Sequence, residues 1–435
     1  MTKYYVWGLG AVGYSFLKKV VGLPIFDPDS FYCVEPNIDR KQLFLELGGK
    51  EEHFILDNIN KENCLDFLKK LNKGDYLLDF ATDIKNLYIV EYCLKHGIHY
   101  LFTADGSWNP DPEWISVHQH FLEYVKLKGD HSENEATSVV AFGMNPGLVS
   151  CFVKQCIREI VCKDESPYVQ KNRKKLKDLL NKNEFALVAK MLEITHIQEV
   201  DNDDQEVSFG YDENVLYSTW CPRSYYFETI SSPELALGTK KEYFAYGKIF
   251  DCDIKDFFIG LYNCGFEYRE STYSPQGFVV GHISTHEEIF TIRRYLSYGK
   301  YRPSVYFVYS PCDYAIRSVQ NYKAKEPIHM HLITKNEIVS GGESVGVIIQ
   351  GNRFKTRYFG NYLKTEDIDE SATIVQVSAG AFAAFVYMVE HPKKGMLFPE
   401  ELDDKEVLTT AKKFLKGYIS LECPRISMNL GRGKN

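Results

Sequence analysis

The sequence predicts an α/β protein in which an N-terminal, doubly wound parallel sheet of the Rossmann type precedes a second, α+β domain with a mixed sheet. Three observations lead to this prediction. In residues 1–148, short apolar runs alternate with helical patterns, which is typical of βαβ units in a parallel sheet covered on both faces. A glycine-rich turn follows the first apolar run. After residue 148 the regular alternation stops, and strand-like runs separated by turns follow.

The strands expected in the first domain are rich in β-branched and aromatic residues. They are "KYYVWG", "FYCVEP", "DYLLDFA", "HYLFTA" and "TSVVAF". The helical patterns between them are "AVGYSFLKKV", "RKQLFLELGG", "ENCLDFLKKLNKG" and "IKNLYIVEYCLKHG". The last of these is expected to end at Gly97, because glycine is the usual residue just after a helix. We therefore expect residues 1–148 to form one nucleotide-binding domain.

The second domain is expected over residues 149–365. It opens with a helix, "VSCFVKQCIREIV", and a lysine-rich stretch, "KNRKKLKDLLNKN", that is typical of a solvated helix face. Strand-like runs follow, namely "EITHIQEV", "KEYFAYG", "GFVVGHIS", "SVYFVYS" and "VGVIIQG". From residue 366 the pattern is helical again, in "ATIVQVSAGAFAAFVYMVEH" and "KEVLTTAKKFLKGYI". We expect residues 366–435 to return to the first domain.

The composition limits the classes of function. A net charge of −8 in 435 residues argues against nucleic acid as the main partner. The 11 cysteines form no C-x-x-C pair and lie in apolar runs, as reduced thiols do in a reducing compartment. We expect no signal peptide at the N-terminus and no apolar run long enough to span a membrane. A cytoplasmic protein without a membrane partner is expected.

The turn "GLGAVG" places Gly8, Gly10 and Gly13 between a strand and a helix. In this G-x-G-x-x-G pattern the glycines permit a tight turn, close approach of a pyrophosphate, and close packing of helix on strand. Ala11 and Val12 lie within the same turn. Glu35 ends the next strand, where a carboxylate binds ribose hydroxyls and repels the additional phosphate of NADP. The sequence therefore predicts an NAD site.

A tryptophan and a glutamate lie eight residues apart in "STWCPRSYYFE", residues 218–228. The proline and the mixed pattern argue against a regular helix, so strand and loop are expected. An aromatic face beside a carboxylate suits an organic cation, and the alternative is a buried core tryptophan with a surface glutamate. The acidic run at 199–206 is typical of a solvated turn, or with Trp220 and Glu228 forms an acidic, aromatic-walled pocket.

Several segments resemble, in this order, the motifs of bacterial-type homospermidine synthase, a family of the saccharopine dehydrogenase-like group. They are "FGMNPGLVSCFVKQ", "STWCPRSYYFETISSPELALGTKKE", "STHEEIFTI", "YRPSVYFVYSPCDYAI", "ESVGVIIQG" and "ATIVQVSAGAFA". The resemblance implies an enzyme that couples two putrescines to sym-homospermidine with release of ammonia. It also implies a tightly held NAD that is reduced and reoxidised, putrescine or related diamines as substrates, and a homodimer. We expect no metal site.

The resemblance also implies roles for individual residues. Trp220 matches the tryptophan whose face holds the reacting cation, and Glu228 matches the carboxylate that anchors the diamine. Asn145 and His286 match residues of the same catalytic pocket.

Three further positions match substrate-binding residues with a change of residue. Asp201 stands where the family has a glutamate, and Glu343 stands where it has an aspartate. Asp105 is the acid nearest to the position where the family has Glu-Pro-Trp and this chain has Gly106-Ser107-Trp108.

In the reaction that the resemblance implies, an amine carbon is oxidised to an iminium, a second diamine replaces ammonia, and the new imine is reduced. An aromatic face contributes about 1–2 kcal/mol to such a cation, and a carboxylate adds more in a low dielectric. Two alternatives remain open. One is a saccharopine or carboxynorspermidine type of reductase, which requires an arginine for a carboxylate. The other is an NAD-binding sensor without catalysis.

Overall fold

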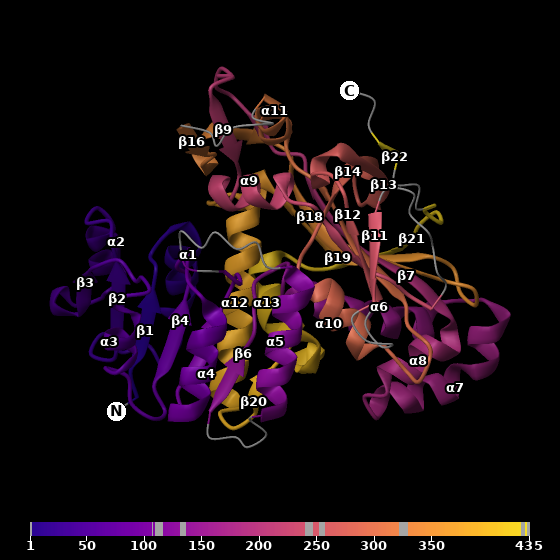
Figure 1. The fold of residues 1–435 in the computed structure, drawn as a ribbon, viewed down its shortest axis with the longest axis horizontal. Helices are drawn as coiled ribbons and strands as arrows, with labels where there is room; N and C mark the ends of the chain where they lie inside the picture. Colours follow the sequence, from indigo (N-terminus) through magenta and orange to yellow (C-terminus); the bar gives the residue numbers. More distant parts are fainter. Residues whose placement is uncertain are drawn as a thin grey trace. The chain divides into compact units, whose positions relative to one another are not determined.

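The computed structural model describes residues 2–106, 108, 116–130, 136–239, 247–251, 257–321, 329–427 and 431–432. The chain forms two compact units (Figure 1). Unit 1 contains Met1–Leu148 and Ile374–Phe414, and unit 2 contains Val149–Thr373 and Leu415–Asn435. Residues 366–373 and 415–435, which we expected to accompany the C-terminal helices into the first domain, therefore belong to unit 2.

Unit 1 is built on a seven-stranded sheet in the order β20-β6-β5-β4-β1-β2-β3, and all its pairs are parallel. The strands are β1 Tyr4–Trp7, β2 Phe31–Glu35, β3 Phe54–Leu56, β4 Tyr76–Asp79, β5 His99–Phe102, β6 Thr137–Val139 and β20 Gly395–Leu397. The order reverses between β1 and β4, which is where doubly wound sheets bind ligands. The predicted Rossmann-type sheet is confirmed.

The helices of unit 1 include the four predicted between strands and the two predicted after residue 366. They are α1 Ala11–Val20, α2 Arg40–Glu46, α3 Cys64–Leu68, α4 Asn86–His96, α5 Val117–Asp130, α12 Ala372–Glu390 and α13 Asp404–Leu415. Helix α4 ends as predicted, with Gly97 left-handed at φ +68°. Two features were missed: helix α5, and strand β20, which joins the sheet beside β6.

Unit 2 contains an 11-stranded mixed sheet whose main path is β11-β12-β10-β15-β7-β18-β19-β21. Strands β7 and β15 are parallel and their other pairings are antiparallel, which confirms the predicted mixed sheet. The strands of this sheet are β7 Ile194–Asp203, β10 Glu234–Ala236, β11 Gly247–Asp251, β12 Phe257–Leu261, β13 Tyr268–Ser274, β14 Gly277–Ser284, β15 Ser304–Ser310, β18 Gly342–Gly351, β19 Arg357–Lys364, β21 Ile419–Glu422 and β22 Gly431–Arg432.

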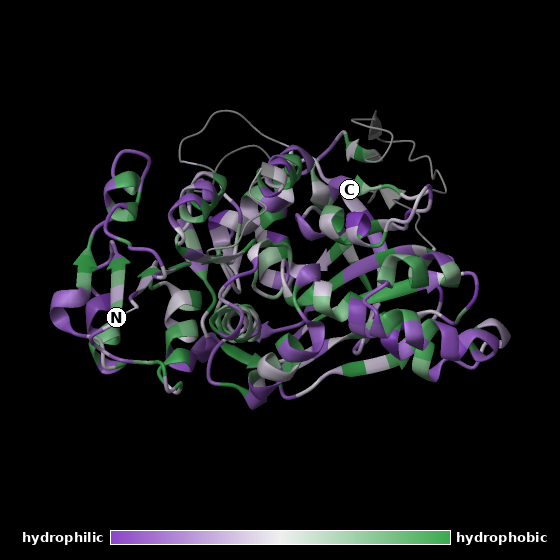
Figure 2. Cartoon of the chain, turned by 90° about the horizontal axis from the view of Figure 1, so that it is seen from below, coloured by the Kyte–Doolittle hydropathy of each residue, from purple (hydrophilic) through white to green (hydrophobic). Residues whose placement is uncertain are grey.

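Two small sheets complete the strands of unit 2. They pair β16 His329–Leu332 with β9 Val215–Ser218, and β17 Ile338–Ser340 with β8 Glu206–Val207. The strand predicted at "KEYFAYG" lies mostly outside the described residues. In Figure 2 both strands and helices carry green and purple segments, as expected where an element packs an apolar side against the core and carries polar residues on its other side.

The helices of unit 2 are α6 Leu148–Lys163, α7 Pro167–Asn181, α8 Phe185–Leu192, α9 Pro222–Ile230, α10 Glu288–Tyr295 and α11 Asp313–Asn321. The prediction of strand and loop for residues 218–228 is wrong after Cys221, because α9 begins at Pro222. Proline is well tolerated at the first helical position, where its missing N–H has no intrahelical partner to lose. The prediction of strand and loop treated Pro222 as if it lay in the interior of a helix, where a proline is strongly destabilising.

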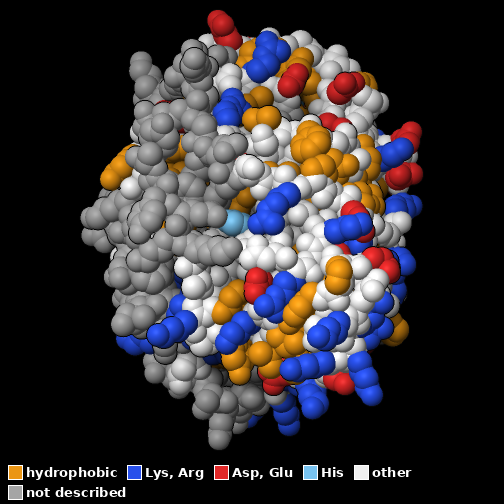
Figure 3. All heavy atoms as spheres, turned by 90° about the vertical axis from the view of Figure 1, so that its right-hand side faces the viewer, with side chains coloured by type: hydrophobic (Ala, Val, Ile, Leu, Met, Phe, Trp, Pro, Cys, Tyr) orange, Lys and Arg blue, Asp and Glu red, His pale blue; other side chains and the backbone are white. Residues whose placement is uncertain are grey.

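The lysine-rich helix α7 has the solvated face that its sequence predicts. Its apolar residues Val169, Leu176 and Leu180 are buried, whereas Lys171, Lys174, Lys175 and Lys177 are exposed. Lysine and arginine side chains are numerous in the lower part of Figure 3, at the level where Figure 1 labels α7 and α8.

The expectation that no apolar segment is long enough to span a membrane is wrong for helix α12. Within the part of the chain that the structure describes, it is the one helix long and apolar enough to cross a membrane, by length and composition alone. Of its most apolar 18-residue window, 83% is buried inside the protein. A core helix of this length passes the same test as a membrane span.

Candidate active site

The glycine-rich turn joins β1 to α1 in unit 1, and each glycine has a distinct environment. Gly8 has φ +83°, and a Cβ there would lie 2.8 Å from the backbone of Phe80 and Ala81. A Cβ on Gly13 would lie 2.2 Å from the carbonyl oxygen of Gly8. Gly10 has no atom within 4 Å of its Cβ position and is the N-cap of α1. The turn thus leaves open space in front of the free N–H groups of α1, which suits a phosphate.

Glu35 lies at the end of β2 and is buried. Its Oε2 accepts a 2.6 Å hydrogen bond from the N–H of Leu9, and its Oε1 accepts one of 2.9 Å from the N–H of Asn37. These contacts fix the carboxylate against the glycine-rich turn. A carboxylate has about four acceptor sites, so acceptor capacity is left for the ribose hydroxyls of a dinucleotide.

Two further predicted residues lie in unit 1. Asn145 is half-buried and precedes Pro146 in the turn between β6 and α6. Asp105 follows β5, where its carboxylate accepts a 2.7 Å hydrogen bond from the hydroxyl of Tyr124 and lies 3.1 Å from Nδ1 of His120. Asp105 therefore has two partners from α5, and its role as an amine contact stays a prediction. Ser107 lies outside the described residues.

In unit 2, one side of the mixed sheet carries polar side chains that are nevertheless buried. We call this set the polar face; its members are Glu199, Asp201, Asp203, His282, Ser284, Tyr309 and Glu343. The register places them side by side, since Tyr309 lies opposite both His282 and Asp201, and Glu343 lies opposite Asp203. The other side of these strands carries Ile283, Val308 and Val200, which are fully buried.

The acidic run at 199–206 is therefore not a solvated turn. Glu199, Asp201 and Asp203 belong to β7, are two residues apart, and so point to the same side of the strand. Burial raises the pKa of Glu343 well above its usual range, and the negative charges of Asp201 and Asp203 raise it further. Burial also raises the pKa of Asp203 to about 6, against hydrogen bonds from Gln205 and Thr219. Such a concentration of buried carboxyl groups favours binding of a cation.

Trp220 follows β9 and is half-buried beside the polar face. Its Nε1–H donates a 3.2 Å hydrogen bond to the hydroxyl oxygen of Tyr309. Its ring meets the ring of Tyr225 edge to face, with 6.5 Å between centroids, and Tyr225 meets Tyr309 in the same way at 6.0 Å. The indole is thus held by its nitrogen and by one ring edge, an arrangement that fixes the direction of its faces.

Glu228 is on α9, within one turn of Tyr225, and it contacts the end of β14. Its carboxylate accepts a hydrogen bond from the hydroxyl of Ser284 and lies 3.3 Å from Nε2 of His286. The other ring nitrogen of His286 lies 3.3 Å from Glu288. Burial opposes ionisation of both groups, but Glu228 and Glu288 raise the pKa of His286 well above its usual range, and His286 in turn lowers the pKa of Glu228. At neutral pH this is a half-buried ion pair.

Among the predicted site residues of unit 2, the structure brings together Glu228 with His286, and Asp201 with Glu343. Trp220 is joined to the second pair through Tyr309, which lies beside Asp201. Sequence reasoning missed Tyr309, Ser284, His282 and Asp203. A signal was present, because alternate polar residues in "GHIS" and "EVDND" share one side of a strand; it identifies polar faces but not which strands are neighbours.

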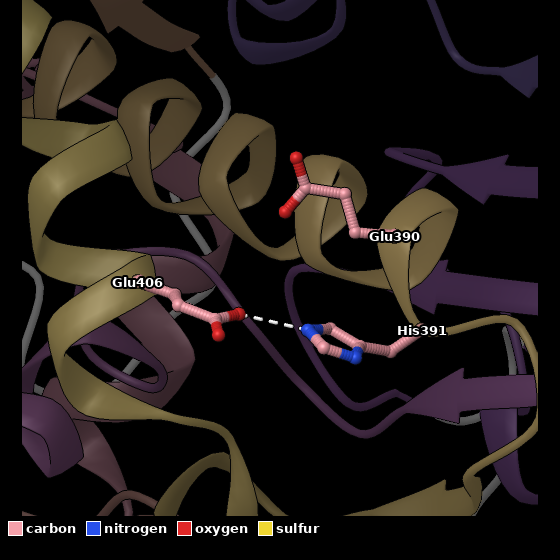
Figure 4. A group of neighbouring side chains, drawn as sticks. All are labelled: Glu390, His391 and Glu406. Carbon is pink, nitrogen blue, oxygen red and sulfur yellow. Dashed lines mark hydrogen bonds and ion pairs between the residues drawn. The ribbon is translucent and has the colours of Figure 1, made fainter.

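One group in the described part of the chain has the spacing of metal ligands. Glu390, His391 and Glu406 have ligand atoms within 4.8 Å of one another (Figure 4). Nε2 of His391 is hydrogen-bonded to Glu406 at 2.8 Å, and both glutamates are exposed. Exposed acidic groups are common without an ion, so we assign no metal here.

Comparison with known proteins supports the fold of both units. Residues 5–139 match the family model of the saccharopine dehydrogenase NADP binding domain. A homospermidine synthase of Legionella pneumophila, solved in complex with NAD, has a TM-score of 0.84 at 22% identity and covers 97% of this chain and 91% of its own. An apo saccharopine dehydrogenase of Saccharomyces cerevisiae has a TM-score of 0.51 at 10% identity, over 97% of this chain and all of its own.

Curated relatives agree over nearly the whole length. Homospermidine synthase of Blastochloris viridis is 24% identical over 94% of this chain and 88% of the relative. That of Mesorhizobium japonicum is 24% identical over 94% and 89%. The fold and the turn define an α/β protein whose residues 5–139 match a nucleotide-binding domain of the saccharopine dehydrogenase type. Within that class the chain is similar to the homospermidine synthases, and the resemblance predicted from its motifs is confirmed.

Proposed function

We propose that this protein is a homospermidine synthase, which couples two putrescines to sym-homospermidine and releases ammonia with NAD as cofactor. The observation that carries the proposal is the arrangement beside the polar face. There an indole ring fixed by Tyr309 and a carboxylate fixed by Ser284 and His286 lie next to buried acids. Similarity to homospermidine synthases over 94% of the chain supports the same conclusion.

Putrescine is a dication at neutral pH, so a site for it needs negative charge and a way to hold one amine without its proton. Glu228 is kept ionised by His286 and is suited to anchor an ammonium group. Asp201 and Glu343 offer further carboxyl groups on the same side of the sheet. The ring of Trp220 stabilises the iminium carbon by cation–π attraction, about 1–2 kcal/mol in a dry site.

The residues of unit 1 fit a dinucleotide. The open space at Gly10 and the start of α1 would hold the pyrophosphate, and Glu35 would hold the adenosine ribose. Bound there, NAD would supply the reversible hydride transfer that oxidation of one amine carbon and later reduction of the new imine require. Because Glu35 is buried and already fixed by two backbone N–H groups, we expect NAD to be preferred over NADP.

The experiment is direct. The full chain is incubated with putrescine and NAD, and homospermidine is measured by mass spectrometry together with ammonia. We expect one ammonia for each homospermidine and no net accumulation of NADH, since the hydride is returned. A parallel run with NADP in place of NAD tests the cofactor preference. Absence of homospermidine at millimolar putrescine with NAD bound would refute the proposal.

A reductase that joins an amine to a carboxylated aldehyde is the second candidate, and one residue favours it. Arg269 on β13 lies opposite His282, in the same row as Tyr309 and Asp201, and an arginine is the usual partner of a carboxylate. This candidate predicts consumption of NADH or NADPH when amine and carboxylated aldehyde are supplied together. The diamine coupling predicts none.

A further inference from the structure

We infer that Tyr309 is a positioning residue that orients the indole of Trp220 for the bound cation. The inference rests on the proposed function, since it names the residue that sets the geometry of the same site. Tyr309 is on β15, in the row between His282 and Asp201. It is the residue through which Trp220 is tied to the polar face.

A hydrogen bond joins the side chains of Trp220 and Tyr309. An indole N–H is a donor only, and here it donates to the phenolic oxygen of Tyr309 at 3.2 Å. Trp220 is half-buried and follows the end of β9, so the strand itself does not fix the plane of its ring. The hydrogen bond holds the edge of the indole, and a ring held by its edge presents its face in one direction.

The hydroxyl of Tyr309 is in its neutral, protonated form. Burial, with Asp201, Asp203 and Glu343 following, raises the pKa of Tyr309 well above its usual range. The hydroxyl therefore keeps its proton at physiological pH. Its oxygen accepts from the indole N–H, and the phenol lies opposite Asp201 in the sheet. Tyr309 thus links the cation-binding ring to the acids that favour the cation.

The ring of Tyr309 is packed against other aromatic rings. The ring of Tyr309 lies 5.5 Å from His282 and 6.1 Å from Phe307, and Phe307 lies 4.6 Å from His286 (all between centroids). The strand and these neighbours hold the ring, so loss of the hydroxyl alone removes the hydrogen bond and leaves the packing. Tyr309→Phe is consequently a clean test of positioning.

The kinetic test is a double-mutant cycle in the full chain with NAD and putrescine. Tyr309→Phe should lower kcat/KM about 3- to 10-fold, the usual contribution of one neutral hydrogen bond. In a Trp220→Phe background the same change should have less than about a 2-fold effect, because phenylalanine has no N–H to be positioned. An equal loss in both backgrounds would overturn the inference, since it would show that Tyr309 acts independently of Trp220.

Tyr225→Phe is the matched control, because it removes the same hydroxyl from a ring that touches the indole only at its edge. A second readout does not need turnover. In protein labelled with ¹⁵N-tryptophan, the indole N–H signal missing from Trp220→Phe identifies Trp220 among the 4 tryptophans. That signal should shift upfield in Tyr309→Phe and stay unchanged in Tyr225→Phe.

The two readouts separate the possible failures. An unshifted signal in Tyr309→Phe would refute the hydrogen bond and with it the inference, whatever the activity. If the wild-type protein forms no homospermidine, the proposed function is refuted, and the NMR signal then decides on the positioning of the indole alone.

Discussion

The glycine-rich turn of unit 1 and the polar face of unit 2 are built in opposite ways. The turn is one contiguous segment, and its backbone does the binding, so its important property is the absence of side-chain atoms. The polar face is assembled from four strands between residues 194 and 351, and its side chains, not its backbone, are the groups proposed to bind the ligand. The turn should therefore be damaged by adding atoms, and the polar face by removing them.

The largest effect is expected from an addition to the turn. Gly10→Asp places a negative side chain where the structure has open space, so the fold survives while a phosphate is repelled. We expect NAD affinity to fall more than about 100-fold by calorimetry. Gly10→Ala is the matched control and should bind NAD much more tightly than the aspartate variant. Unchanged affinity in Gly10→Asp would place the dinucleotide elsewhere.

The next effect tests removal of one charge beside the polar face, where Glu228 of α9 contacts Ser284. Glu228→Gln keeps the volume but loses the ion pair with His286, and we expect kcat/KM for putrescine to fall about 100-fold. The pKa of His286 should also fall, since one of its two carboxylate neighbours is lost; an NMR pH titration measures this. Glu366→Gln, an exposed glutamate, is the control. Wild-type turnover in Glu228→Gln would exclude the anchoring role.

A smaller effect is expected from removal of the aromatic face. Trp220→Ala should lower kcat about 5- to 30-fold, as the loss of about 1–2 kcal/mol implies, and Trp220→Phe should retain part of the rate because the smaller ring keeps a weaker cation–π attraction. Steady-state kinetics on both variants sharpens the comparison. If phenylalanine were no better than alanine, the contribution would come from the indole N–H and not from the ring face.

The smallest effect concerns a buried acid beside the turn. Burial raises the pKa of Asp79 to about 7, although Tyr100 and the N–H of Ala81 donate to it. Because the folded pKa exceeds the unfolded value near 3.8, stability should decrease as pH rises from about 4 to 7. Asp79→Asn should flatten this dependence and raise the free energy of unfolding at pH 8 by about 1–3 kcal/mol. Denaturant unfolding at pH 5 and 8 measures it; equal pH slopes would contradict the assignment.

The same contrast explains what the sequence could predict. The turn, Gly97 and the alternation of unit 1 are local patterns, and local patterns can be read directly. Tyr309 and Asp203 belong to an assembly whose strand neighbours are set by register across more than 100 residues, which periodicity does not reveal. The helix after Cys221 was missed for a simpler reason, since a proline has opposite effects at the first position and in the interior of a helix.

The return of the chain to unit 1 has a consequence for synthesis on the ribosome. Strand β6 has β20 as its neighbour, and β20 lies at residues 395–397. The first 148 residues leave the ribosome with that edge of their sheet unpaired, and all of residues 149–373 are made before the missing strand emerges. An unpaired strand edge is a site for aggregation. The first unit to begin is thus among the last to be completed, and a chain halted before residue 395 keeps β6 as the edge strand of its sheet.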